Sequence, residues 1–440
     1  MANTTLVNAK EAKQDEFYTQ YYDIEREVEA YLDYNPNVFR GKTVLLPCDD
    51  PEWSNFTKYF AQNFERLGLK KLISTSYAVE RKHERYGVQL SLFETEFETS
   101  SPQYDKKKTK SHGKIFILDN DESGDGRIDI EDLKWQYLKG DGDFRSAEVT
   151  KLRDEADIIV TNPPFSLFRE FFAWVIDTGK KFLLISNKNC ITYKEVFPYI
   201  KASKMWTGKT SMSQDILFKI PPELQMQFIA NGKEGSKYKN VNGEILGRSP
   251  SVWFTNIDHG RLHQPLELMT LSDNLKYSKH KDLKEKHAYE MYDEYNAIEI
   301  PFTDAIPSDY EKVMGVPISF LDKHCIEQFD IVGLDRYVDD NPRYGHRFHL
   351  RGKETYARIL IQKNNIMNAQ GRKEIAKHIA SLENIKSILE NMKDEEEEKY
   401  DNMPEGLQES ERGEQMQEAI EQLEMACDNL EETINNLQEI

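Results

Sequence analysis

Apolar residues of this chain gather in short runs, and between these runs they recur every three or four positions. The short runs predict buried strands over 43–46, 71–74, 114–118, 157–160, 181–185 and 216–220. The wider spacing predicts helices over 11–33, 53–67 and 168–177. Strands that alternate with helices form a mainly parallel sheet covered by helices. We therefore expect an α/β fold.

The pattern changes twice along the chain, which at 440 residues is too long for one ordinary domain. A polar, irregular stretch at about 80–113 predicts an exposed insertion in a first domain, 1–230. From 231 to 365 short strands lie among Gly-, Pro- and Tyr-rich loops, which predicts a separate recognition region. We expect residues 366–440 to form a third unit, an acidic and amphipathic helical tail.

The C-terminal unit carries two apolar stripes at helical spacing. The second stripe follows a strict 4-3-4-3 pattern and comprises Met416, Ile420, Leu423, Cys427, Leu430, Ile434 and Leu437. The first comprises Ile375, Ile379, Leu382, Ile385 and Leu389, and the acidic run 394–398 is the expected connection. Two interpretations remain open, an intramolecular helical hairpin and a coil for self-association or for binding a partner.

The net charge of −19 lies mostly in this tail, because residues 382–440 hold 19 acidic and 4 basic residues. Two stretches of the body are locally basic, 106–114 and 336–358, and the second is interleaved with aromatic residues. Such stretches are often solvated surface, but they are also the pattern that binds phosphates and bases. The candidate nucleic-acid contacts are Lys107, Lys108, Arg343, Arg347 and Arg351.

The four cysteines lie far apart, which argues against a zinc site and against a disulfide framework. The N-terminus has no basic start followed by an apolar stretch, and no apolar run reaches membrane-spanning length. We expect a soluble, cytoplasmic protein that does not bind a membrane.

One acidic loop matches the spacing of a calcium-binding loop at Asp121, Ser123, Asp125, Gly126, Asp129 and Asp132. Its twelfth position is Asp instead of the usual bidentate Glu, and a strand precedes it where a helix is required. We therefore predict a loop without metal.

The strongest chemical signal is Asn162-Pro163-Pro164-Phe165, directly after the apolar run 158–160. Proline lacks an N–H and fixes φ, so the tetrapeptide leaves the sheet as a rigid turn at the edge where open α/β sheets bind ligands. The Asn162 side-chain oxygen and the Pro163 carbonyl are two acceptors for an amino group on an aromatic ring, and Phe165 offers a stacking face. An ordinary turn is the alternative, but a helical pattern follows, which favours a site that alkylates a planar amino group.

These residues resemble the S-adenosylmethionine-dependent DNA adenine-N6 methyltransferases, most of all the EcoRI-type family. The tetrapeptide 162–165 resembles their catalytic motif, 15–20 is similar to their N-terminal Phe-Tyr-Thr element, 45–53 looks like their first strand and cofactor loop, and 142–144 resembles their Asp-Phe step. The loop 47–53 contains no glycine, and the second strand, 72–77, contains no acidic residue. The likeness covers about residues 10–365. It implies cofactor contacts at Tyr18, Thr19, Pro47, Cys48, Asp49, Asp50, Asp143 and Phe144.

The resemblance implies a Rossmann-like methyltransferase domain that flips an adenine out of double-stranded DNA and methylates its N6 at a specific sequence, as in restriction–modification. Asn162, Pro163, Pro164 and Phe165 would be the catalytic residues. Two alternatives stand beside it, because the same tetrapeptide suits any planar amino group. One is a methyltransferase for an RNA base or a protein glutamine, and the other is a catalytically silent DNA-binding protein.

Overall fold

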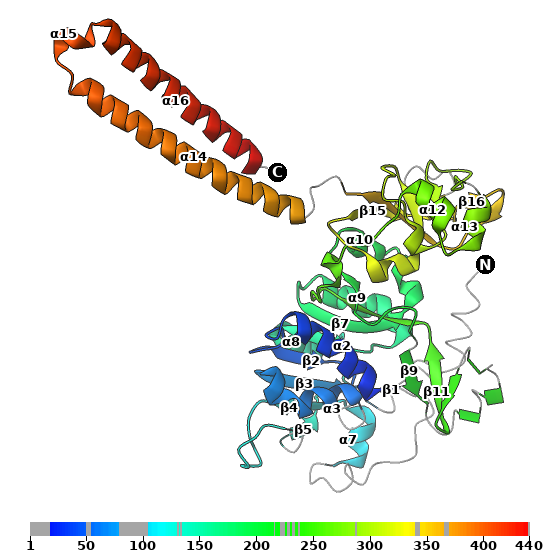
Figure 1. Ribbon diagram of the computed structural model, residues 1–440. Coiled ribbons are helices and arrows are strands. Elements are labelled where there is room, and N and C mark those ends of the chain that lie inside the picture. Colours follow the sequence, from blue (N-terminus) through cyan, green and yellow to red (C-terminus); the bar gives the residue numbers. More distant parts are fainter. Residues whose placement is uncertain are drawn as a thin grey trace. The chain divides into compact units, whose positions relative to one another are not determined.

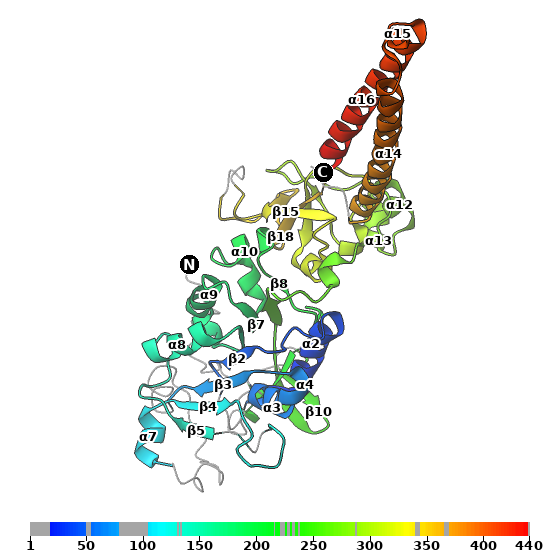
Figure 2. The ribbon, with the colours of Figure 1, turned by 90° about the vertical axis from the view of Figure 1, so that its left-hand side faces the viewer.

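The computed structural model describes residues 18–49, 54–78, 104–129, 132, 134–214, 216–220, 225–226, 229–230, 234–235, 238–286, 288–338, 344–364 and 369–438. Contacts divide the chain into two compact units, Met1–Lys363 and Asn364–Ile440. Figures 1 and 2 show both units, and each is treated by itself below.

The first unit is built on an eight-stranded sheet with the strand order β5-β4-β3-β2-β6-β7-β12-β8. Its bounds are β2 (Thr43–Leu46), β3 (Lys71–Ser76), β4 (Lys114–Leu118), β5 (Lys134–Tyr137), β6 (Ile158–Thr161), β7 (Lys181–Asn187), β8 (Trp206–Thr207) and β12 (Ser251–Thr255). Strands β3, β2, β6 and β7 run parallel to their neighbours in that block, as predicted. The α/β, Rossmann-like fold expected from the sequence is confirmed.

The sheet is less parallel than the sequence pattern predicted. Strand β4 pairs antiparallel with β3, and Ser76 lies opposite Lys114. The chain leaves β3 at its carboxyl end and enters β4 at that same end of the sheet, after helix α7 (Lys106–Ser111). Strand β4 therefore runs antiparallel to β3. Strands β5, β12 and β8 are also antiparallel to their partners.

Helices cover both faces of the central strands, as Figure 2 shows. Leu45 and Ile159 point into one core with α8 (Ala147–Glu155) and α9 (Phe168–Ile176). Val44 and Ile158, one position earlier, point into the other core with α2 (Tyr21–Tyr34), α3 (Asn55–Gln62) and α4 (Phe64–Leu67). Because successive residues of a strand face opposite sides, two apolar faces require a run without polar alternation, which is what 43–46 and 158–160 provide.

Two predicted helices are shorter than expected. The helix expected over 11–33 begins at Tyr21 as α2 (Tyr21–Tyr34), because Tyr18–Thr19 is strand β1; residues 11–17 lie outside the described part. The helix expected over 53–67 divides into α3 (Asn55–Gln62) and α4 (Phe64–Leu67). Gly68 ends α4 with a φ of 64°, a conformation that glycine adopts without strain.

Two smaller sheets complete the unit. The first has the order β1-β9-β11-β10, with β9 (Ile216–Lys219), β10 (Tyr238–Val241) and β11 (Glu244–Ser249). The second has the order β13-β14-β18-β15, with β13 (Ile298–Glu299), β14 (Met314–Pro317), β15 (Phe329–Leu334) and β18 (Arg358–Lys363). The hairpin β16–β17 (His349–Leu350 and Lys353–Glu354) and helices α12 (Leu271–Tyr277) and α13 (Lys281–Lys286) lie in the same region of the sequence. Strand β12 of the central sheet falls after residue 230, so the chain returns to the central sheet beyond that point.

The second unit is a helical hairpin of α14 (Ala369–Asp401) and α16 (Glu411–Gln438), joined through the short α15 (Glu405–Gln408) (Figure 1). Cys427 and Ile434 of α16 are buried, and Lys386 Nζ lies 2.7 Å from Glu431 Oε2 across the pair. The stripe 416–437 is therefore covered by α14 within the same chain.

Two details of this unit differ from the sequence prediction. The acidic run 394–398 lies inside α14, since glutamate is a good helix former, and Pro404 stops the helix instead. Ile385, predicted on the inner stripe, is 46% exposed. The three-residue step from Leu382 to Ile385 turns its side chain away from the seam, where Lys386 takes the inner position.

The four cysteines all lie in the described part of the chain and form no disulfide. Among the helices that the structure describes, none combines the length and the apolar character needed to span a bilayer.

Candidate active site

Strand β2 is the topological switch point of the central sheet, where the strand order changes direction. Strand β3 follows it on one side, and β6 joins it on the other. Open α/β sheets bind ligands outside the carboxyl ends of the strands at such a switch point. Asp49 follows β2 and Asn162 follows β6, so both lie at this point.

A buried carboxylate ties the two strand ends together. Asp49 Oδ1 accepts a hydrogen bond of 2.7 Å from the Ser54 hydroxyl, and Oδ2 accepts one of 2.6 Å from the Thr161 hydroxyl. Ser54 is also the N-cap of α3 and accepts from Phe56 N–H. Asp49 thus fixes Thr161, the residue directly before Asn162, which is a positioning role that the sequence had not indicated.

Hydroxyl groups of β3 hold the backbone of the loop after β2. Thr75 Oγ1 donates to the Pro47 carbonyl over 3.1 Å, and Ser74 Oγ donates to the Asp49 carbonyl over 2.8 Å. Cys48, between them, is half-buried, and the predicted contact Asp50 lies outside the described residues. The side chains of β3, where the sequence has no acidic residue, thereby fix the course of this loop.

The tetrapeptide leaves the sheet as the predicted rigid turn. Pro163 is buried, while Asn162, Pro164 and Phe165 are half-buried. Leu167 N–H donates to the Pro164 carbonyl over 2.9 Å, which starts the 3-10 turn η2 (Phe165–Leu167) and leads directly into α9. The Asn162 side chain is therefore carried on a short segment that is fixed at both ends.

Strand β1 brings Thr19 of the N-terminal element to the same turn. Asn162 Nδ2 donates to the Thr19 hydroxyl over 3.5 Å, and Asn55 Nδ2 donates to the Thr19 carbonyl over 2.7 Å. Thr19 is buried and pairs with Phe218 of β9. Only the backbone of Tyr18 is described, so its predicted side-chain contact stays a prediction. The small sheet thus places Thr19 beside Asn162, with the amide nitrogen turned toward it.

The segment 142–144 lies against the carboxyl end of β3. Gly142 has a φ of 80°, and a Cβ there would be 2.1 Å from the Ser76 carbonyl oxygen. Asp143 is half-buried and forms an ion pair of 2.7 Å with Arg145. The Phe144 ring packs edge-on against Phe171 and Trp174 in the core. Of the two predicted cofactor contacts, Asp143 is the one with an accessible side chain.

The predicted nucleic-acid contacts differ in their surroundings. Lys107 and Lys108 are on α7, which directly precedes β4. Because β4 starts opposite the carboxyl end of β3, α7 lies at the same end of the strands as Asn162. Lys107 and Lys108 are both exposed, whereas Thr109 on the same helix is buried.

Two predicted contacts of the second basic stretch differ in exposure, because Arg347 is half-buried and Arg351 is exposed. Arg343 lies outside the described residues, and Arg347 is half-buried. Burial raises the pKa of Asp335 to about 6, and the positive charge of Arg347 is among those that oppose this shift, so Arg347 lies near that carboxyl. Arg351 occupies the tip of the β16–β17 hairpin with its side chain 81% exposed and 2.7 Å from Glu290.

The carboxylates of the calcium-like loop accept hydrogen bonds from the loop's own backbone. Asp121 accepts from Gly124 and Gly126 N–H, and Asp132 accepts from Glu122, Ser123 and Asp129 N–H. Within the described residues, no group of three His, Cys, Asp or Glu side chains is arranged to hold a metal ion.

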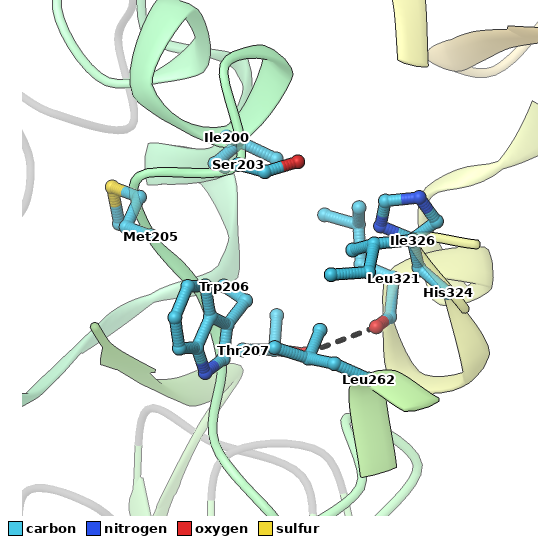
Figure 3. A pocket seen from close by; sticks show the side chains of 9 residues that line it. All are labelled: Ile200, Ser203, Met205, Trp206, Thr207, Leu262, Leu321, His324 and Ile326. Carbon is cyan, nitrogen blue, oxygen red and sulfur yellow. Dashed lines mark hydrogen bonds between the residues drawn. The ribbon is translucent and has the colours of Figure 1, made fainter. Parts of the chain in front are cut away.

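Figure 3 shows a small cavity away from these motifs. It is lined by Ile200, Ser203, Met205, Trp206, Thr207, Leu262, Leu321, His324 and Ile326. Thr207 Oγ1 donates to the Leu321 carbonyl over 3.2 Å beside it, and His324 is hydrogen-bonded to the Phe329 carbonyl. Burial lowers the pKa of His324, so the cavity presents a mostly apolar and uncharged wall.

Ser54, Asn55 and Thr161 belong to the site, and none of them was among the candidate site residues predicted from the sequence. Two local signals were available. Ser54 stands before a helical pattern, where serine is a common N-cap, and Thr161 directly precedes the tetrapeptide. The hydrogen bond from Thr161 to Asp49 requires two strand ends 112 residues apart to meet, which no local pattern predicts.

The link between Asp49 and Thr161 yields a testable expectation. Thr161→Val keeps the shape and removes the hydroxyl, so it should lower turnover of the enzymatic reaction by about 10- to 100-fold, the usual value of a hydrogen bond to a charged group. Thr161→Ser should restore turnover to within a few-fold. Steady-state kinetics should show the loss in kcat with little change in KM; an equal loss in the serine and valine variants would contradict the positioning role.

Comparison with known proteins gives one family and several relatives. Residues 5–410 match the family model described as "Adenine-specific methyltransferase EcoRI". The chain is 39% identical over 364 residues to "Type II methyltransferase M.EcoRI" of Escherichia coli, covering 83% of this chain and 98% of that protein. It is 30% identical over 374 residues to "Type II methyltransferase M.MpnI" of Mycoplasma pneumoniae, covering 82% and 98%. No solved structure matches the chain. The family match ends before α16 begins.

Proposed function

The chain belongs to the EcoRI family of adenine-specific methyltransferases, and from this premise we propose that it methylates the N6 amino group of adenine in double-stranded DNA with S-adenosylmethionine as donor. The observation that carries the proposal is the Asn162–Phe165 turn at the switch point of the sheet, held by Asp49 through Thr161. The type II designation of the relatives supports a role in restriction–modification, in which methylation is confined to one DNA sequence.

The turn is suited to an exocyclic amino group. Such a nitrogen is a weak nucleophile because its lone pair is delocalised into the ring. The Asn162 side-chain oxygen and the Pro163 carbonyl oxygen accept its two hydrogens, which favours a tetrahedral nitrogen and stabilises the positive charge that develops on it. Thr19 accepts from the amide nitrogen of Asn162, which orients the amide oxygen away from Thr19.

An adenine inside a duplex cannot reach this turn, so it must be flipped out of the stack. Phe165, half-buried against the core, offers a face on which the flipped ring stacks. Unstacking costs a few kcal/mol, which contacts with the flipped base and with the backbone must offset.

The residues around the switch point fit the proposed donor. When bound, it supplies an electrophilic methyl group on a sulfonium. The loop 47–49 and the half-buried Asp143 border the carboxyl ends of β2 and β3, where sheets of this type hold nucleotide-like ligands. Asp49 itself is occupied by Ser54 and Thr161, so we assign it to positioning the turn.

The test is methyl transfer by the purified protein from isotope-labelled S-adenosylmethionine to double-stranded DNA, RNA and protein substrates. Nucleoside digestion and mass spectrometry of the DNA should identify N6-methyladenine. Label in RNA or in glutamine would favour the alternative substrates. Binding of the donor without transfer to any substrate would favour a silent DNA-binding protein.

We expect Arg351 and the basic face of α7 to contact DNA phosphates, because both are exposed and positively charged. Arg351→Ala, or Lys107→Ala with Lys108→Ala, should weaken DNA binding and reduce the slope of log affinity against log salt by about 0.9 for each lost phosphate contact. Lys399→Ala, in the second unit, serves as the control. Fluorescence anisotropy at several salt concentrations measures the slope; an unchanged slope in both variants would place the DNA contacts elsewhere.

A further inference from the structure

Helix α14 carries a second stripe that the hairpin leaves uncovered. It consists of His378, Ser381, Ile385, Ile388, Met392 and Glu395, which follow a 3-4-3-4-3 spacing and lie on one face of the helix. All six are exposed, and the apolar members Ile385, Ile388 and Met392 are 46%, 51% and 51% exposed. We call this stripe the outer face of α14.

The outer face is distinct from the seam of the hairpin. Leu382 and Leu389, half-buried, and Lys386, paired with Glu431, mark the side of α14 that meets α16. At 100° per residue the outer face is turned by about 110° from this seam. The hairpin alone therefore cannot cover Ile385, Ile388 and Met392, and three large apolar side chains remain together in water.

The spacing of the outer face is symmetric about the point between residues 386 and 387. If a second α14 lies antiparallel across it, Ile385 faces Ile388, Ser381 faces Met392, and His378 faces Glu395, each pair occurring twice. A two-fold dimer requires this kind of self-complementary surface, in which one patch binds its own copy.

The charges along α14 favour the same arrangement. Residues 375–393 hold three Lys and two acidic residues, whereas 394–401 hold six acidic residues and one Lys. An antiparallel partner places each acidic end beside the other copy's basic half. A parallel partner would place the two acidic ends side by side, where like charges repel.

We propose that the outer face of α14 is a homodimer interface, at which two hairpins associate antiparallel into a four-helix bundle. The occupant is a second copy of this chain. The interface lies outside the residues assigned to methyl transfer, so it does not depend on the proposed function.

Sedimentation velocity of the full chain over a range of concentrations tests the proposal. The wild type should show a monomer–dimer equilibrium. The double variant Ile385→Lys/Ile388→Lys should raise the dissociation constant by about 100-fold or more, because four isoleucines lose their apolar partners. Met425→Lys, at an apolar position of α16 that is 65% exposed and away from the outer face, should leave the dimer unchanged. Circular dichroism checks that the helices persist in each variant.

A charge exchange tests the pairing of positions. His378→Glu should weaken the dimer by about threefold to tenfold, because it faces Glu395 of the other copy. Adding Glu395→Lys to His378→Glu should recover the lost affinity. No recovery would contradict the antiparallel register.

Cross-linking tests the orientation. A mixture of Ser381→Cys and Met392→Cys chains should form a disulfide between the two variants, whereas Ser381→Cys alone should not, since two copies of that position lie about 16 Å apart in an antiparallel pair. Self-linking of Ser381→Cys would show a parallel pair and overturn the proposal. A protein that stays monomeric at every concentration, or that dimerises equally well with both lysines present, would overturn it as well. In either of these two cases, the outer face of α14 would not be the surface that binds a second copy of the chain.

Discussion

Asn162→Ala is expected to lower turnover of methyl transfer by about 100- to 1000-fold, the usual cost of removing one preorganised group that stabilises developing charge. The side chain lies at the end of β6 on a turn fixed by Asp49 through Thr161 and by the start of α9. Alanine keeps this turn, because Pro163 and Pro164 still restrict it. The loss should therefore appear in kcat, while affinity for S-adenosylmethionine stays within a few-fold.

The matched control is Asn189→Ala, an exposed asparagine just after β7, at the same edge of the sheet. This variant should keep near-wild-type turnover. Single-turnover kinetics and calorimetric titration of the cofactor, run on both variants, separate chemistry from binding. If purified Asn162→Ala turns over at the wild-type rate, the tetrapeptide is a structural turn and the proposed mechanism is wrong.

Glu27→Ala is expected to cost about 3 to 5 kcal/mol in the free energy of unfolding. Glu27 is fully buried on α2 and accepts from Lys209 N–H at 2.6 Å, from Thr210 N–H at 2.7 Å and from the Tyr31 hydroxyl at 3.0 Å. Its removal leaves these donors without their acceptor at a buried position. A Cβ on Gly208 would lie 2.2 Å from Glu27 Oε1, so the loop is held close to this carboxylate.

Two further variants make this measurement specific. Glu27→Gln keeps one oxygen acceptor and the volume, so it should lose less stability than alanine does. Glu25→Ala, on the same helix but half-exposed, should stay within about 0.5 kcal/mol of the wild type. Urea unfolding followed by circular dichroism gives all three values. A loss under 1 kcal/mol in Glu27→Ala would show that the loop finds other acceptors.

The loop that Glu27 holds is linked to the active site through strands β9 and β1. This loop leads into β9, which pairs with β1, and β1 carries Thr19 beside Asn162. A local loosening of this loop would thus reach the orientation of the catalytic amide. We expect Glu27→Gln to fold and yet to lose part of its turnover, more than its small change in stability would explain.

Local rules determined much of this protein from the sequence alone. Apolar runs located β2 and β4 to the residue, because a strand buried on both faces needs consecutive apolar side chains. Two prolines after β6 required a rigid turn, and its position at a strand end, with the resemblance to known methyltransferases, indicated the family that the comparisons confirmed.

Contacts between residues that lie far apart in the sequence were decided by the tertiary structure alone. The direction of β4 depends on which edge of the sheet the chain re-enters, and the meeting of Asp49 with Thr161 and of Thr19 with Asn162 depends on which strands become neighbours. In the tail, the apolar spacing predicted two helices, but only the folded hairpin showed which stripe each helix buries and that the outer face of α14 stays exposed. Periodicity records which side chains share a face, whereas the partner of that face is set by long-range packing.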